Sequence, residues 1–469
     1  MFRTGSVKVL FALWALLCGA AAMAQPANAG FKGPFGISGV LVEGNRKTKE
    51  KIILRELTFR EGDTLSAVDL YERLEQSRKN LLNLGLFNTV DLLPTFLGPH
   101  EVFISVGVNE RWFWIPVPQV SFADPNFNTW WLTRDFSRLN YGAAVKGQNL
   151  RGRNETMAAL AQLGYIKKFG LAYRVPYVDR SQRWGAQVEG AYGEQDETTI
   201  GTVGNKRVML KTPAQAIMQR WRAGAGATFR RSLYIRHALG ITWNQVAVRD
   251  TVVARNPDYL APGKGRVQYI SLAYSATMDR RDSRAFPLQG TFAKLECSKD
   301  GIGAGHPGVA NILATVQQSW RSGQRWSLGA SVKGKLSRGT PKHYFLQEGI
   351  GYADYMRGYE YYIIDGQDFL LGKANILFAL VTPRSYRAEG IPWEPFRTLN
   401  LAVYLNAFSD HGYVRDTVHG AQNFLSNQWQ HSYGLGLDVV TSYDFVLRLE
   451  WAVNRMDETG FYLHFTQPF

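Results

Sequence analysis

The strongest constraint on the fold is an alternation of apolar and polar residues, which repeats in short segments from about Ser121 to Phe469. In RWSLGASVKGKL one side is apolar through Trp326, Leu328, Ala330 and Val332. In FVLRLEWAV the apolar side holds Phe445, Leu447, Leu449, Trp451 and Val453, and the other side holds Arg448 and Glu450. Successive side chains of a β-strand point to opposite faces, so these segments predict strands with one apolar and one polar face. Such strands fit a membrane barrel with lipid outside and water inside.

The length supports the same interpretation. Residues 121–469 suffice for roughly 16 strands of about 10 residues with their connections. A soluble β-sandwich also explains the alternation, but it does not explain aromatic residues near strand ends or a chain that ends on Phe469. After residue 24 no window of about 18 apolar residues predicts a membrane helix. We therefore predict an all-β transmembrane barrel of about 16 antiparallel strands, preceded by a small α+β domain.

Residues 1–24 read as an export signal. Arg3 and Lys8 precede an apolar stretch, and Ala22-Met23-Ala24 is a small-x-small cleavage site. Lipidation at Cys18 is the less favoured alternative, because the bulky Leu17 precedes it. Cleavage would leave one cysteine, Cys297, so we expect no intrachain disulfide.

Residues 31–110 have a βααββ rhythm. A first strand stops at Gly44-Asn45, a turn pair. Thr48 is placed to cap a first helix, and Ser66 with Asp69 resembles the capping box of a second. That second helix carries one apolar stripe of Leu70, Leu74, Leu81 and Leu84, and Gly85 is placed to end it. Two strand segments follow. Residues 111–120, rich in Trp and Pro, are interpreted as a linker between this domain and the barrel at 121–469.

The charge is concentrated in the barrel segment. The whole chain carries +15, the signal +2 and residues 31–110 a net −1, so the remainder carries +14. A basic barrel could attract anions inside or anionic lipid head groups outside. Spreading of the excess over solvated loops is the plainer interpretation. Nucleic acid is not expected as a partner, since no binding motif accompanies the charge.

The first domain resembles a POTRA domain. The matching pieces are Val42 to Asn45, Arg55 to Leu57, Glu61 to Asp63, and Leu84 to Phe87. A generic two-layer α/β module is the alternative. The resemblance implies that an extended chain or partner protein adds a strand at the sheet edge.

A POTRA domain followed by a barrel is similar to the BamA/TamA superfamily of outer-membrane assembly factors, which includes the bacterial surface antigen barrels. The most specific mark is Arg357-Gly358-Tyr359 within DYMRGYEYY, which resembles the family's tip on a long loop folded back into the lumen. The resemblance implies that Arg357 pairs with an acid on the inner wall, and Asp410 in NAFSDHGYV is the expected partner. The family often has a second acid, a Glu, where this chain has Ala379, so Asp410 is expected to be more alone.

A second motif, DRRDSRAFPLQG, resembles the family's strand–turn–strand. Its motif residues are Asp279, Arg281, Asp282, Pro287 and Gly290. We expect the two aspartates to bind Arg281 or neighbouring basic groups. A simple polar turn is the alternative for this stretch taken alone.

No enzyme signature is present. The chain has no G-x-S-x-G elbow, GIGAGHPG lacks the Lys-Ser/Thr of a phosphate loop, and its eight His have no metal-ligand spacing. We expect no cofactor, no metal and no catalysis.

The resemblance implies a protein of the bacterial outer membrane, with its POTRA domain in the periplasm, that inserts or translocates other proteins. Client outer-membrane or exported proteins, outer-membrane lipids with anionic head groups, and periplasmic chaperones or lipoproteins are the implied partners. Two alternatives stay open: a two-partner-type secretion pore for one substrate, and a passive anion-preferring channel or scaffold. In the implied mechanism the POTRA domain receives client chains, and the barrel passes them to the membrane through its lumen or through the seam between its first and last strands.

Overall fold

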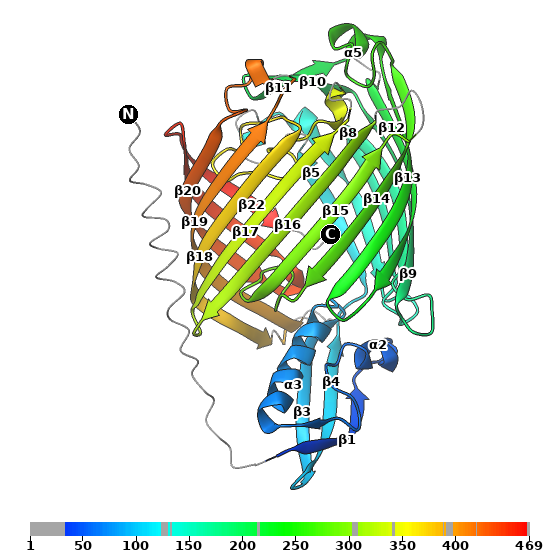
Figure 1. Cartoon of the computed structure of the whole chain (residues 1–469), viewed down its shortest axis with the longest axis vertical. Coiled ribbons are helices and arrows are strands. Elements are labelled where there is room, and N and C mark those ends of the chain that lie inside the picture. Colours follow the sequence, from blue (N-terminus) through cyan, green and yellow to red (C-terminus); the bar gives the residue numbers. More distant parts are fainter. Residues whose placement is uncertain are drawn as a thin grey trace.

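The computed structural model describes residues 33–122, 130–131, 134–212, 216–302, 308–339, 343–387, 389–390, 397–418 and 420–466. The predicted export signal (1–24) and the terminal Phe469 lie outside these residues. The molecule has a small domain below one end of a large barrel (Figure 1). We call this end of the barrel the near end and the opposite one the far end.

The small domain is a four-stranded sheet with two packed helices. Its elements are β1 (Phe35–Glu43), α2 (Glu50–Leu54), β2 (Thr64–Leu65), α3 (Ala67–Leu82), β3 (Phe87–Gly98) and β4 (Glu101–Glu110). The strand order is β2-β1-β4-β3, with β1 parallel to β4. One buried core joins sheet and helices through residues such as Ile53, Leu70 and Ile104. The predicted βααββ rhythm is therefore confirmed, with the two-residue β2 added.

The local signals of this domain act as the sequence indicates, with one exception. The hydroxyl of Ser66 accepts a hydrogen bond from the Asp69 N–H at 3.1 Å and begins α3. Gly44 has φ +83°, and a Cβ there would lie 2.0 Å from the Val108 carbonyl oxygen. Thr48, however, does not cap α2: the N-cap is Lys49, which makes no side-chain cap bond.

The barrel is one 16-stranded antiparallel sheet, which confirms the predicted fold class. Its strands are β5 (Trp114–Phe122), β6 (Leu139–Gln148), β7 (Thr156–Gly164), β8 (Ile166–Val175), β9 (Trp184–Gln195), β12 (Met218–Arg230), β13 (Ile235–Val248), β14 (Arg266–Asp279), β15 (Gly290–Asp300), β16 (Val309–Ser322), β17 (Trp326–Arg338), β18 (Asp368–Arg387), β19 (Thr398–Arg415), β20 (Trp429–Thr441), β21 (Val446–Asn454) and β22 (Thr459–Thr466). Each strand pairs with the next one along the chain, except that β9 pairs with β12.

The far end carries the additional elements. The hairpin of β10 (Glu197–Val203) and β11 (Lys206–Lys211) lies between β9 and β12, and α5 (Asp250–Arg255) follows β13. Figure 1 shows these elements at the end of the barrel remote from the small domain. None of the helices in the described ranges is both long enough and apolar enough to cross a membrane.

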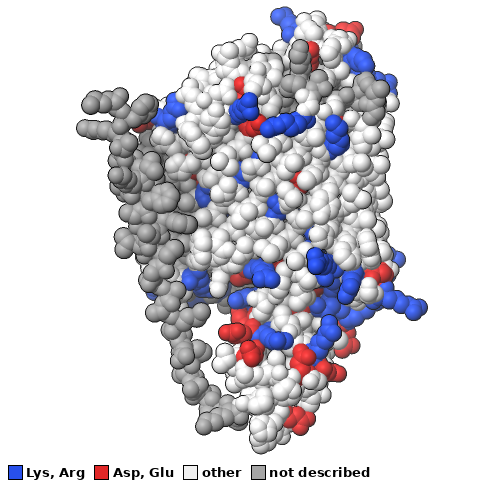
Figure 2. Space-filling model, in the orientation of Figure 1, with Lys and Arg blue, Asp and Glu red and all other residues white. Residues whose placement is uncertain are grey.

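The predicted faces of the strands are present. Trp326 and Val332 are each 52% exposed on the outside, whereas Glu450 is 2% exposed on the inside. In Figure 2 the wall between the two ends is mostly uncharged, and charged residues gather over the small domain and the barrel ends. An apolar outer band is what a lipid-facing barrel requires.

The predicted linker at 111–120 needs correction. Strand β5 begins at Trp114 and pairs in register with β6, so most of this stretch is barrel wall rather than a hinge. Pro116 and Pro118, which favoured the linker interpretation, are compatible with a strand because that strand lies at the edge of the sheet.

Candidate functional site

The connection between β17 and β18 folds back into the barrel. Its apolar residues Ile350, Met356 and Ile364 form a buried cluster with wall residues of β18 and β19. This packing brings the predicted loop tip, Arg357-Gly358-Tyr359, against the inner wall. A loop that projected into water would expose these side chains, but Arg357 is only 4% exposed and Tyr359 only 2% exposed.

The structure places Arg357 and Asp410 in direct contact. Arg357 Nε donates to Asp410 Oδ2 at 2.9 Å, a second guanidinium nitrogen donates to Oδ1, and the Arg357 backbone N–H donates to Oδ2 at 3.1 Å. Asp410 lies on β19 and is fully buried. A two-pronged pair fixes both the position and the orientation of the guanidinium.

Asp410 was expected to be more alone because Ala379 replaces the usual Glu, but two further side chains hold Arg357 with it. Arg357 Nη1 donates to Asn375 Oδ1 of β18 at 2.7 Å, and the same nitrogen lies 3.5 Å from Glu450 Oε1 of β21. The guanidinium also lies 3.9 Å from the ring centroid of Phe408. The second acid thus comes from a different strand.

Ala379 is not part of this site. It is buried in an apolar cluster with Phe286 and Tyr404. It lies four residues beyond Asn375 along β18, or about 13 Å at the rise of an extended strand. The alternation placed Glu450 inward but could not indicate which loop it faces.

Gly358 and Tyr359 complete the tip. The Gly358 carbonyl accepts a hydrogen bond from Asn454 Nδ2 at 2.9 Å. The Tyr359 hydroxyl donates to the His431 carbonyl at 3.1 Å and accepts from the Arg455 N–H at 3.1 Å. Gly358 has φ +83°, and a Cβ would lie 3.3 Å from that of Ala452. The tip therefore favours glycine for its left-handed backbone, and it leaves an added Cβ only a tight fit against Ala452.

These two constraints give a prediction. We expect Gly358→Ala to destabilise the barrel by about 1–2 kcal/mol from the left-handed backbone and by roughly a further 1–3 kcal/mol from overpacking. Gly323→Ala is the matched control, because Gly323 has φ +65° but no atom within 4 Å of the added Cβ. Urea unfolding in detergent micelles measures both, and equal losses would show that the tip has room for a methyl group.

The loop also contacts the last strand of the barrel. His464 Nε2 of β22 lies 3.2 Å from Glu360 Oε1 and 3.5 Å from Glu450 Oε2, and its ring stacks on Tyr355 at 4.8 Å. Burial raises the pKa of the Glu360 carboxyl. The loop is therefore held by β18, β19, β20 and β21 and reaches β22. Of the wall residues that hold it, only Asp410 was identified from the sequence.

The second motif forms the turn between β14 and β15 at the near end of the barrel. Asp279 ends β14 and binds Arg281 at 2.8 Å. Among the described residues Asp282 has no basic partner: its Oδ1 accepts the backbone N–H groups of Ser283, Leu288 and Gln289 at 2.9–3.1 Å. Pro287 lies between the buried Phe286 and Leu288. Gly290 begins β15 with φ +109°, where a Cβ would lie 2.2 Å from the Arg280 carbonyl oxygen.

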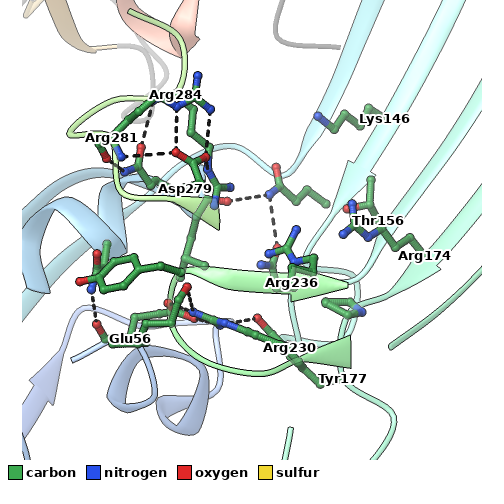
Figure 3. Close-up of a pocket in the computed structure, with 18 residues that line it drawn as sticks. Glu56, Lys146, Thr156, Arg174, Tyr177, Arg230, Arg236, Asp279, Arg281 and Arg284 are labelled. Atoms are coloured by element: carbon green, nitrogen blue, oxygen red, sulfur yellow. Dashed lines mark hydrogen bonds and ion pairs between the residues drawn. The ribbon is translucent and has the colours of Figure 1, made fainter. Parts of the chain in front are cut away.

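This turn contacts the small domain. Asn83 Nδ2, just after α3, donates to the carbonyl of Arg281 at 3.1 Å. A second contact joins Glu56, just after α2, to Arg230 at the end of β12, through two hydrogen bonds of 2.5 and 2.6 Å (Figure 3). Thr48 Oγ1 accepts from Asn149 Nδ2 at 2.8 Å, so Thr48 contacts the barrel. Sequence reasoning missed this interface because its partners are 100 to 200 residues apart.

The sheet has two unpaired edges. β5 and β22 are its terminal strands, and within the described residues no ladder joins them. The Gln148 N–H donates to the Phe113 carbonyl at 2.7 Å. Because bonded pairs alternate along an antiparallel ladder, Trp114, Pro116, Pro118 and Val120 direct their backbone groups to the open edge. Two of these four positions have no N–H to donate.

The described part of the chain contains no group of three or more His, Cys, Asp or Glu side chains arranged to hold a metal ion. The candidate site has three parts. They are the β17–β18 loop held against the inner wall, the unpaired seam between β5 and β22, and the small domain bound to one end of the barrel.

The chain was compared with known proteins. Residues 149–469 match the Omp85 superfamily domain, and residues 35–111 match a POTRA domain described as a surface antigen variable number repeat. No curated protein matches. Among solved structures, BamA from Haemophilus ducreyi lacking POTRA domains 1–3 is 15% identical, with TM-score 0.51 over 92% of this chain and 84% of that one. CdiB from Escherichia coli is 10% identical, with TM-score 0.50 over 99% and 98%. At such identities the likeness concerns the fold alone, but the family match spans most of the chain, which therefore belongs to the Omp85 superfamily and carries a POTRA domain.

Proposed function

We propose that this protein inserts or translocates other proteins at the bacterial outer membrane, with its POTRA domain in the periplasm. Membership of the Omp85 superfamily supports this class of activity. The observation that carries the proposal is the unpaired seam between β5 and β22 beside the docked POTRA domain. Unpaired backbone groups in lipid cost several kcal/mol each, so an open edge favours pairing with an incoming strand.

Passage by the seam is favoured over passage through the lumen. The loop tip is anchored by the buried contacts of Arg357 and Tyr359, and the cluster around Met356 fills the space beside β18 and β19. A chain passing through the lumen would have to displace these contacts, and a passive channel would have to conduct around them. An incoming strand at the seam leaves the tip contacts to β18, β19, β20 and β21 in place.

Depletion of the protein in its host, followed by quantitative proteomics of the outer membrane, tests the proposal. Loss of many barrel proteins supports general assembly. Loss of one protein or a small set indicates a dedicated client, as in two-partner secretion. An unchanged outer membrane contradicts the proposal and favours a channel or scaffold. Re-expression of the wild-type chain is the control for effects of the depletion itself.

A further inference from the structure

A cavity of about 280 Å³ lies where the POTRA domain meets the barrel. Glu56 and Asn83 line it from the POTRA side, and side chains of β6, β8, β12, β13 and β14 line it from the barrel (Figure 3). Arg174 and Arg236 alternate with the outward Leu171 and Leu239, so both point into the barrel interior. The cavity is therefore shielded from the lipid-facing surface.

The lining is strongly basic. Its cationic side chains are Lys146, Arg174, Arg230, Arg236, Arg281 and Arg284. Only two carboxylates, Glu56 and Asp279, face them, which leaves an excess of four positive charges. In Figure 3 the labelled arginines surround the same space from separate strands and from the turn after β14.

Both carboxylates are already engaged. Glu56 binds Arg230, and Asp279 binds Arg281 at 2.8 Å and Arg284 at 3.2 Å. Arg174 and Arg236 consequently have no carboxylate partner within the described part of the chain.

The placement of Arg236 costs stability. Arg236 lies directly opposite Arg230 in the β12–β13 ladder, and like charges in that position destabilise a sheet. The fold has no evident need for a second guanidinium there, because Arg230 alone makes the contact to Glu56. An arrangement that is unfavourable by itself becomes favourable when an anion binds between the guanidinium groups.

Guanidinium groups recognise carboxylates and phosphates through paired N–H donors. A lipid phosphate would have to leave the bilayer to enter this interior site. The volume of the cavity approaches the lower end of ordinary ligand pockets, about 300 Å³. The cavity lies between the POTRA domain, which is expected to receive a chain, and the barrel lumen. We propose that Arg174 and Arg236 form a binding site for the carboxylate side chains of an acidic polypeptide segment arriving from the POTRA domain. This inference rests on the proposed function for the origin of the segment.

The test uses the purified full chain in micelles and a fluorescent octaglutamate peptide. We expect binding that weakens as salt rises from 50 to 200 mM, no binding of octalysine, and at least tenfold weaker binding to Arg174→Gln/Arg236→Gln. The control Arg222→Gln alters another lumen arginine, which is paired with Glu189 at 2.9 Å and does not line the cavity. It should leave the affinity within twofold.

Three outcomes would overturn the inference. Unchanged affinity in the double variant would place binding elsewhere. Displacement of the peptide by equimolar inorganic phosphate would indicate a site for small free anions. A lower unfolding midpoint of the double variant would indicate a structural role, because removing facing like charges should leave the midpoint equal or higher. Peptide binding needs no client insertion, so the depletion experiment and this one can fail independently.

Discussion

Asp410→Asn should destabilise the barrel by about 3–5 kcal/mol, because it leaves the Arg357 guanidinium buried without its main counter-charge. The neighbouring Glu450 compensates little, since it lies 3.5 Å from a single guanidinium nitrogen whereas Asp410 accepts from two nitrogens and the backbone. The expected result is a lower urea midpoint in micelles, together with new trypsin cleavage after Arg357, which the wall otherwise covers.

Asp354→Asn is the matched control. It removes the same type of charge from the same loop, where Asp354 pairs with Lys333 at 2.6 Å but both side chains are more than a fifth exposed. Pairs with this much access to solvent contribute about 1 kcal/mol or less. Equal effects of the two variants would contradict the view that the contacts of the tip, rather than those of the loop as a whole, keep the loop folded into the barrel.

Much of the barrel could be predicted from the sequence because alternation is a local property. Trp326 and Glu450 were assigned to the correct faces without knowledge of their neighbours. The first strand was missed, because Pro116 and Pro118 are read as breakers unless the edge position of their strand is known. Whether a strand lies at an edge is a property of the closed sheet and not of its own residues.

In the candidate site, too, features set by local sequence could be predicted, and features set by contacts between distant segments could not. Arg357 and Asp410 were identifiable through motifs, each within a few residues of chain. Asn375, Glu450 and His464 carry no motif, and they meet the loop only because strand register brings three further strands to one height of the wall. The POTRA–barrel contacts, such as Glu56 with Arg230, join residues 174 apart in the sequence. Pairing at that separation requires coordinates or an alignment.

Pro116→Thr/Pro118→Thr should strengthen the seam and slow client insertion. The double variant restores two N–H donors on the edge of β5 that faces away from β6. Each hydrogen bond formed across the seam would contribute about 0.5–1.5 kcal/mol, so two such bonds would slow opening by roughly 5- to 150-fold. The rate at which an unfolded barrel protein acquires its folded gel mobility, in liposomes containing the variant, measures this effect.

Val120→Thr is the control, because Val120 lies on the same edge and already has its N–H. Liposomes that contain the Val120→Thr variant should insert the client protein at the same rate as liposomes that contain the wild-type chain. Prolines also protect an open edge from pairing with any passing strand. If this were their main role, the restored donors would speed insertion by giving the client strand more partners, a result that would contradict the prediction. Slower insertion with a higher melting midpoint shows that the prolines keep the seam open. Faster insertion with an unchanged midpoint shows that β5 is the strand on which clients pair and that its prolines limit access to it.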